Sequence, residues 1–172
     1  MEGFLPGEEC GICRGRCCKE HGCSLSPEDL IKLLGGVRPN VSNVEELLTS
    51  KDGLYAIDTF GGAVGQVYFI RMRHKCYTFI GIDAMGECIA LTEKGCSLSY
   101  EERPTGGRCL KSSPAFACVQ QYDGAAMESD WLPYQDILKS IWNKYYDKFE
   151  AEGIFDACDE EYFKWQKENS LK

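Results

Sequence analysis

The feature that most constrains the fold of this chain is a run of four cysteines near its start. Cys10, Cys13, Cys17 and Cys18 fall within nine residues, in the segment C-G-I-C-R-G-R-C-C. So short a segment cannot bury four thiol side chains for hydrophobic reasons alone. Soft thiolates do gather in this way around Zn²⁺ or an iron–sulfur cluster. We therefore expect residues 1–24, which are rich in glycine and cysteine and show no periodicity, to form a loop wrapped around metal.

The cellular compartment decides between metal binding and disulfide bonding. Residues 1–30 contain no basic segment followed by an apolar one, so we expect no secretory signal and a cytoplasmic protein. No stretch approaches the roughly 18 uncharged apolar residues of a membrane span. Reduced cytoplasmic thiols favour metal, and 11 cysteines, an odd number, cannot all pair within one chain. A disulfide framework is the alternative if a signal peptide has been lost.

Length and charge restrict the remaining possibilities. We expect 172 residues to form a single metal-chelating domain over 1–172, with a Cys-cluster core at 1–120 and a helical C-terminal extension at 121–172. A hydrophobic content of 44% is enough for a core. A formal net charge of −8 argues against a nucleic-acid partner, since such a protein needs a basic face for phosphates.

Two short helices are expected after the first loop. Ser26 can cap a helix that has Pro27 at its first position and acidic residues in its first turn. Gly35-Gly36 ends this helix. A second helix is expected at about 43–50, where Ser42 and Glu45 have the spacing of a capping box.

The middle of the chain has strand patterns and the last third has helical ones. Strands are expected at Leu54–Phe60, Gln66–Arg73, Tyr77–Ile82 and Cys88–Leu91, which together predict an antiparallel meander of three or four strands. Apolar residues recur at helical spacing over Trp131–Glu152, and a last helix is expected at Asp159–Asn169. The predicted class is α+β: a small antiparallel sheet and a Cys-rich metal-stapled loop, with C-terminal helices.

A second group of cysteines lies where the expected strands meet turns. Because a sheet fixes the direction of residues at its edges, this group and the first four can converge on one site that staples the fold. The predicted metal ligands are Cys10, Cys13, Cys17, Cys18, Cys76, Cys88, Cys96, Cys109 and Cys118. Cys23 and Cys158 have no partner at ligand spacing, and the segment before Cys158 is expected to precede a helix.

The adjacent pair Cys17-Cys18 bears on how many metal ions are bound. Neighbouring residues of an extended segment point in opposite directions, so a single tetrahedral ion seldom takes both. If both are ligands, a binuclear site or a cluster is favoured. The alternative is one ligand beside one buried, inert thiol. His21 and His74 lie near the cysteines, and we expect them to neighbour the ligands rather than bind metal.

The cysteine pattern resembles that of a known family. C-x2-C-x3-C-C over Cys10–Cys18, followed by spaced cysteines at 76, 88 and 96 and by Glu102-Arg103-Pro104, is similar to the YkgJ-type cysteine-cluster family of zinc- or iron-chelating domains. The resemblance covers about residues 8–118. It implies metal chelation and no defined reaction.

The chain departs from this family at one position. The family commonly has cysteine three residues after the proline, where this chain has Gly107. Cys109 and Cys118 are both candidates for the last ligand, and the sequence does not decide between them.

The sequence therefore predicts a metal-binding protein that holds its metal with thiolates. Zinc is the first choice of cofactor, and iron or a 4Fe-4S cluster is the alternative. A structural or protein-interaction role, with another protein as partner, is favoured because so many thiolates can saturate the metal. The competing hypothesis is an enzyme or redox module of unknown reaction whose metal keeps an open or electron-accepting position.

Overall fold

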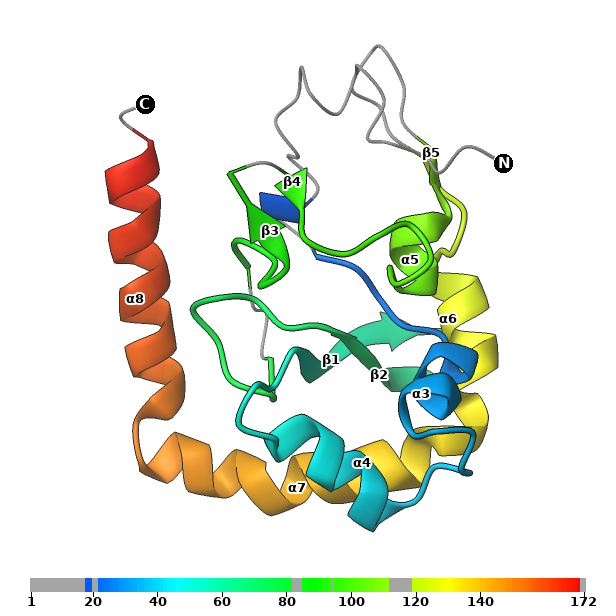
Figure 1. Cartoon of the computed structure of the whole chain (residues 1–172). Helices are drawn as coiled ribbons and strands as arrows, with labels where there is room; N and C mark the ends of the chain where they lie inside the picture. The colour runs from blue at the N-terminus through cyan, green and yellow to red at the C-terminus, as the bar shows by residue number, and fades with distance from the viewer. Residues whose placement is uncertain (1–17, 20–21, 82–84, 94, 112–118, 171–172) are drawn as a thin grey trace.

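In the computed structural model the chain forms helices around a central β-hairpin, with small paired segments at one end (Figure 1). The structure describes residues 18–19, 22–81, 85–93, 95–111 and 119–170. The α+β class predicted from the sequence is confirmed. The expected loop at 1–24 falls mostly outside the described residues.

The first two helices begin at side chains that cap them. Helix α3 (Pro27–Leu33) starts after Ser26, whose hydroxyl accepts from the Asp29 N–H at 3.3 Å while the Asp29 carboxylate accepts from the Ser26 N–H at 3.0 Å. This reciprocal pair is a capping box and confirms the predicted start. Helix α4 (Val41–Thr49) is capped by Asn40 and not by Ser42, so it begins earlier than predicted.

The central hairpin pairs β1 (Tyr55–Gly62) with β2 (Gly65–Met72) in antiparallel register. The Glu128 carboxylate holds the turn, because it accepts from the N–H groups of Ala63 and Val64 at 2.9 and 2.8 Å. A Cβ atom at Gly62 would lie 2.7 Å from that carboxylate and from the Val67 side chain, so glycine lets both approach the turn without shifting. The first two predicted strands are thus confirmed with small shifts.

The predicted meander was wrong beyond this hairpin. Residues 77–81 do not form a strand with a ladder of their own, and Ile80 makes only an isolated parallel bridge to Ile57. The segment at 88–91 ends in β3 (Leu91–Thr92), which pairs with β4 (Gly95–Cys96) rather than with the hairpin. A further pair, β5 (Leu110–Lys111) with β6 (Val119–Gln120), follows the short helix α5 (Thr105–Arg108).

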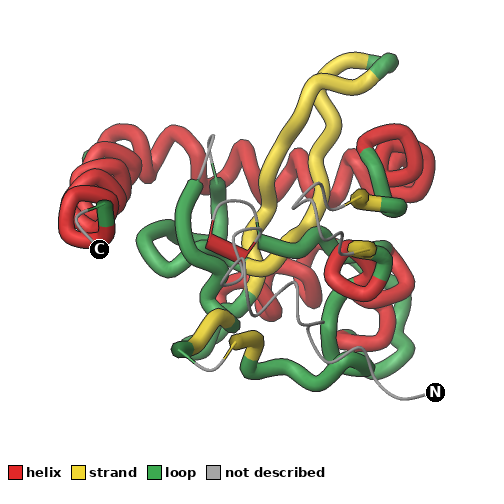
Figure 2. The backbone as a smooth tube through the Cα atoms, turned by 90° about the horizontal axis from the view of Figure 1, so that it is seen from above, coloured by secondary structure: helices red, strands yellow, loops and turns green. Residues whose placement is uncertain are grey.

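The C-terminal helices form a layer under the hairpin and an arm beside it (Figures 1 and 2). The long helix predicted at Trp131–Glu152 is present but begins later, as α7 (Gln135–Ala151). Trp131 ends a separate helix, α6 (Gly124–Trp131), and the 3₁₀ turn η1 (Leu132–Tyr134) lies between the two. Pro133 lies in the 3₁₀ turn, where the missing N–H of proline interrupts the α-helical ladder. Gly153 has a φ of +67° and separates α7 from α8 (Ile154–Asn169), which turns away along one side of the molecule.

The main core lies between the hairpin and these helices. Its fully buried members include Ile57, Ile70, Ile80, Trp131, Leu138 and Ile141. Trp131 also donates from its indole N–H to the Leu25 carbonyl at 3.0 Å, which ties α6 to the chain just before α3. The core therefore joins residues that are far apart in the sequence.

Gln135 takes the place of a neighbouring strand at the edge of β2. Its side-chain amide accepts from the Tyr68 N–H at 2.8 Å and donates to the Tyr68 carbonyl at 2.8 Å. Tyr68 is only 7% exposed, so water cannot readily replace these bonds.

We predict that Gln135→Ala lowers the free energy of unfolding by about 1–3 kcal/mol, because it leaves both buried backbone groups of Tyr68 without their partner. Chemical denaturation followed by circular dichroism measures the change. Gln166→Ala, at an exposed position of α8, is the matched control and should change stability little. Equal stability of the two variants would show that the Gln135 clamp contributes nothing.

Candidate metal centre

Four cysteines from separate parts of the chain pack against one small apolar cluster. The cluster centres on Met72, Ala90 and Leu91 and includes Cys88, which is 3% exposed. Cys18, Cys23 and Cys96 are partly buried and pack against it. We call Cys18, Cys23, Cys88 and Cys96 the thiol group. Cys23, Cys88 and Cys96 are free thiols.

Backbone pairing fixes three members of the thiol group relative to one another. The Cys88 N–H donates to the Cys18 carbonyl at 2.6 Å, which joins the end of the first cysteine run to the segment before β3. Cys88 also makes an antiparallel bridge to His74, just after β2. Cys96 lies in β4 opposite Leu91 of β3. In Figure 1 the helical turn at residues 18–19 accordingly lies close to β3 and β4.

The fourth member, Cys23, lies between β2 and α5. The Met72 N–H donates to the Cys23 carbonyl at 2.8 Å, so residue 23 begins a short pairing with the edge of β2. On its other side the Gly106 N–H donates to the neighbouring Ser24 carbonyl at 2.9 Å. A Cβ atom at Gly107 would lie 3.0 Å from the Cys23 sulfur.

The thiols affect one another electrostatically. Burial raises the pKa of Cys23 most, and the thiols of Cys18, Cys88 and Cys96 raise it further, while Arg103 acts in the opposite direction. Burial also raises the pKa of Cys88, and Cys96 adds to the effect. Cys23 and Cys88 therefore lie in a poorly hydrated environment that disfavours their thiolate forms.

A buried polar network lies beside Cys88. The Arg71 guanidinium is 3.0 Å from the Asp58 carboxylate and 3.1 Å from Nε2 of His74. All three residues are at most 8% exposed. Because this nitrogen of His74 faces a guanidinium, which only donates, it serves as an acceptor for Arg71.

The structure places the remaining predicted ligands in different parts of the molecule. Cys76 packs with buried Tyr77 and Cys158 against α8, where the Tyr77 hydroxyl donates to Asp159 at 2.8 Å. Cys109 ends α5, and its carbonyl accepts from the Gln121 N–H at 3.3 Å. Cys10, Cys13, Cys17 and Cys118 lie outside the described residues. Of the nine predicted ligands, the structure thus brings together Cys18, Cys88 and Cys96.

The described residues do not by themselves complete a coordination shell. Within the described part of the chain, no three histidine, cysteine, aspartate or glutamate side chains form a group that could hold a metal ion. The four cysteines of the thiol group therefore pack against the same apolar cluster without forming a metal site by themselves. A metal site that includes the thiol group needs further ligands from the cysteines outside the described residues.

The structure places Cys158 and Cys23 differently from what the sequence predicted. Cys158 does not precede a helix but lies within α8 on its buried face, 8% exposed, and burial raises its pKa. A raised pKa makes it an inert thiol rather than a reactive one. Cys23 was missed because its sequence spacing matches no ligand motif. Its place beside β2 arises from strand pairing, which spacing along the chain does not reveal.

Helix α5 is braced against α3 by one carboxylate. Asp29 accepts from the Thr105 N–H at 2.7 Å and from the Arg108 guanidinium at 2.8 Å, in addition to its capping bond with Ser26. Burial alone would raise the pKa of Asp29, but these hydrogen bonds outweigh it and hold the pKa below its usual value. The segment that carries Arg103 and Gly107 is thereby fixed beside Cys23.

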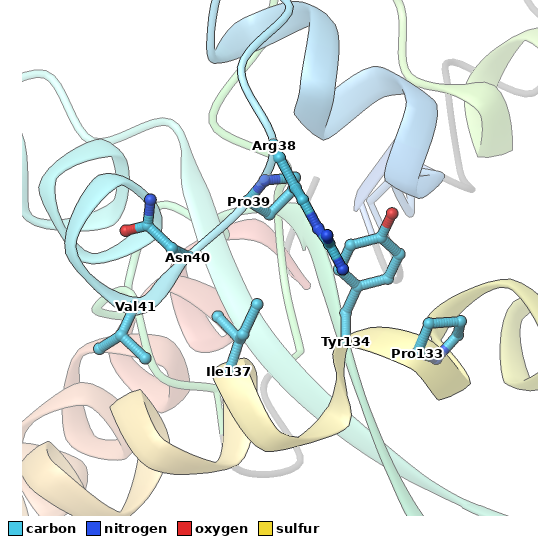
Figure 3. A pocket seen from close by; sticks show the side chains of 7 residues that line it. All are labelled: Arg38, Pro39, Asn40, Val41, Pro133, Tyr134 and Ile137. Carbon is cyan, nitrogen blue, oxygen red and sulfur yellow. The ribbon is translucent and has the colours of Figure 1, made fainter.

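The structure also contains a surface pocket of about 510 Å³, far from this chemistry (Figure 3). It lies between the loop that precedes α4 and the start of α7, and the Arg38 side chain extends toward the Tyr134 ring. Its lining holds no cysteine, histidine or carboxylate: Arg38, Pro39, Asn40, Val41, Pro133, Tyr134 and Ile137. The pocket therefore offers no metal ligand.

Comparison with known proteins adds no relative. No family model, no curated protein and no solved structure matches this chain. The resemblance to the YkgJ-type family rests on the motif residues alone and stays a prediction. Among the described helices, none combines the length and the apolar character needed to cross a membrane.

We predict that Asp29→Asn lowers the free energy of unfolding by about 1–3 kcal/mol at neutral pH, because it removes a charged acceptor that joins α3 to α5. The folded pKa of Asp29 lies below the unfolded value of about 3.9, so its contribution is complete above that value and is lost as the pH falls through the folded pKa. Urea denaturation across this pH range should show the two proteins converging in acid. Glu28→Gln, one residue away and exposed, is the control; a constant difference at every pH would contradict the prediction.

Proposed function

We propose that this protein binds a metal ion or cluster through cysteine thiolates, and that the metal staples the N-terminal cysteine run to the segment around β3 and β4. The ligands in this proposal come from the first run, Cys10–Cys18, and from Cys88 and Cys96. The observation that carries it is the direct backbone contact between Cys18 and Cys88, two members of separate cysteine groups. Contact between the two groups is the arrangement that a shared metal site requires.

The weak regular structure of this region supports a stapling role. Strands β3 and β4 have two residues each, and among the described residues the apolar cluster beneath them has four buried members. So little burial stabilises a substructure poorly, and short paired segments are marginal in water. In small domains of this kind a metal often supplies the missing energy, since its binding energy is then folding energy.

Zinc is the metal that we propose first. It accepts an all-thiolate shell, has no redox chemistry of its own and suits a site whose purpose is to hold chain segments together. An iron–sulfur cluster is the alternative, and the adjacent cysteines Cys17 and Cys18 are what favour it, because two metal centres can take two neighbouring thiolates that point apart.

The test is the metal content of the protein purified under anaerobic conditions. We expect tightly held zinc in a fixed ratio to the chain, no visible absorption and no acid-labile sulfide. Brown protein with iron and sulfide would replace zinc by a cluster and keep the thiolate proposal. Metal-free protein whose thiols remain intact would overturn it.

A pair of matched variants connects the metal to the thiol group. Cys18→Ser should lose most of the bound metal and lower the melting temperature, because it removes a ligand next to Cys88. Cys158→Ser makes the same chemical change at a more deeply buried thiol within α8 and should keep its metal. Metal analysis and thermal denaturation of both proteins give the comparison, and equal metal content in the two variants would contradict a site at Cys18.

A further inference from the structure

We propose that the surface pocket beside the N-terminal ends of α4 and α7 binds a small organic carboxylate with an apolar body. The pocket has a volume of about 510 Å³ and lies between the loop that precedes α4 and the start of α7 (Figure 3). Pockets that hold small molecules commonly have volumes of about 300–1,000 Å³, apolar walls and a few polar groups. The proposal concerns a second site, so it does not depend on the metal centre.

The walls of this pocket are mostly apolar. Four of the seven lining side chains are hydrocarbon: Pro39, Val41, Pro133 and Ile137. The apolar surface continues at the rim, since exposed Val37 adjoins Arg38 in the sequence and exposed Leu132 adjoins Pro133. An apolar ligand body placed here removes this surface from water, which favours binding.

The frame of the pocket is held by contacts that need no ligand. The Asn43 side chain donates to the Arg38 carbonyl at 3.1 Å, and Asn40 and Asn43 exchange capping bonds at 2.8 and 3.1 Å. On the opposite wall the Tyr134 ring packs edge-on against fully buried Trp131, with ring centroids 6.1 Å apart. A pocket fixed on both sides costs little further ordering when a ligand enters.

The polar groups of the lining are hydrogen-bond donors with one positive charge. Arg38 is the charged residue of the lining, and within the described part of the chain its guanidinium makes no hydrogen bond or ion pair. The Asn40 side-chain oxygen accepts from the Asn43 N–H, so its amide N–H₂ is left to donate. The Tyr134 hydroxyl can donate as well. Asp136, in the first turn of α7, is exposed and does not line the pocket.

A carboxylate complements this donor set. It carries one negative charge and only accepts hydrogen bonds, and its two oxygens match the planar fork of a guanidinium. A phosphate carries more charge than a single arginine offsets. The alternative is a pocket that takes apolar groups without regard to charge, since Arg38 is exposed and water weakens its attraction for an anion.

The test compares 4-phenylbutyrate with its neutral amide, 4-phenylbutanamide, in two-dimensional NMR titrations of the full chain. The two probes have nearly the same shape and differ in charge. We expect 4-phenylbutyrate to bind with a dissociation constant on the order of 1 mM and to shift the backbone signals of Val41 and Ile137. The amide should bind at least about threefold more weakly, a modest factor because Arg38 is exposed.

Matched variants assign this preference to Arg38. Arg38→Gln removes the charge and should weaken carboxylate binding about threefold while it leaves amide binding unchanged. Arg38→Lys keeps the charge and should keep a preference for the carboxylate. Lys51→Gln removes an exposed charge beyond the other end of α4 and should bind both probes like wild type. Val41→Trp, at an exposed position of the wall, should obstruct the pocket and weaken both probes.

Three results would overturn the proposal. The first is no signal change at the pocket with 4-phenylbutyrate at about ten times the expected dissociation constant. The second is equal affinity for the two probes, which would leave an apolar pocket without a preference for anions. The third is an equal loss of carboxylate affinity in Arg38→Gln and Lys51→Gln, which would replace contact with Arg38 by a general effect of charge. None of these results involves the bound metal, so the proposed function is tested separately.

Discussion

The pairing of residues 23–25 with the edge of β2 is the contact on which the rest of the structure depends. The Met72 N–H bonds to the Cys23 carbonyl and the Leu25 N–H bonds to the Ile70 carbonyl, each at 2.8 Å. From this short segment, Ser24 receives a bond from α5 and Leu25 receives one from the indole of Trp131 in α6. Three otherwise separate parts of the chain therefore meet at three consecutive backbone carbonyls.

This contact also explains why the thiol group and the main core are separate but connected. Leu25 is fully buried in the core, whereas Cys23, two residues earlier, packs in the cysteine-containing cluster. Residues 23 and 25 lie on the same face of their extended segment. They nevertheless pack in different clusters, because residue 25 pairs with Ile70 of the main core and residue 23 pairs with Met72 of the other cluster. Movement at the thiol group is thus resisted by the core through a few strong backbone bonds rather than through a large apolar interface.

The sequence predicted the elements whose signals are local. Ser26, Pro27 and Asp29 carry the start of α3 within four residues, and the alternation of Gln66–Arg73 belongs to one strand. The sequence-based predictions were wrong where contacts between distant segments determine the secondary structure. Residues 77–81 have a strand-like composition, yet Ile57 bonds to both Phe79 and Gly81 at one point only, and the chain then leaves the hairpin. Gln135, which occupies the edge of β2, carries no signal of that role because its partner Tyr68 is remote in the sequence.

The same distinction applies to the candidate site. The spacing of Cys10–Cys18 identifies thiols that a short loop can bring together, and no structure is needed to infer their chemistry. Which distant residues lie near Cys18 depends on backbone pairing. The Cys88 N–H donates directly to the Cys18 carbonyl while Cys88 also bridges to His74, and Cys23 pairs with β2. Cys76, only two residues from His74, points into the contact with α8 instead. Their spacing along the sequence predicts the same role for Cys76 and Cys88, whereas the fold places the two residues in different clusters.

Charge is the remaining constraint on a centre of this kind. The protein has a net charge of −8, and each thiolate would add to it locally. Arg71 acts to lower the pKa of Cys88 and Arg103 that of Cys23, but burial outweighs both and raises the pKa of each thiol above its usual value. Arg71 is held by buried Asp58 and His74, so it cannot turn toward solvent without leaving a buried carboxylate uncompensated, which is costly. Arg71 is already compensated by Asp58, so its place beside Cys88 does not require a thiolate. Burial favours the neutral thiol at both Cys23 and Cys88, so either sulfur would ionise only with a further positive charge close to it, such as a metal ion would supply.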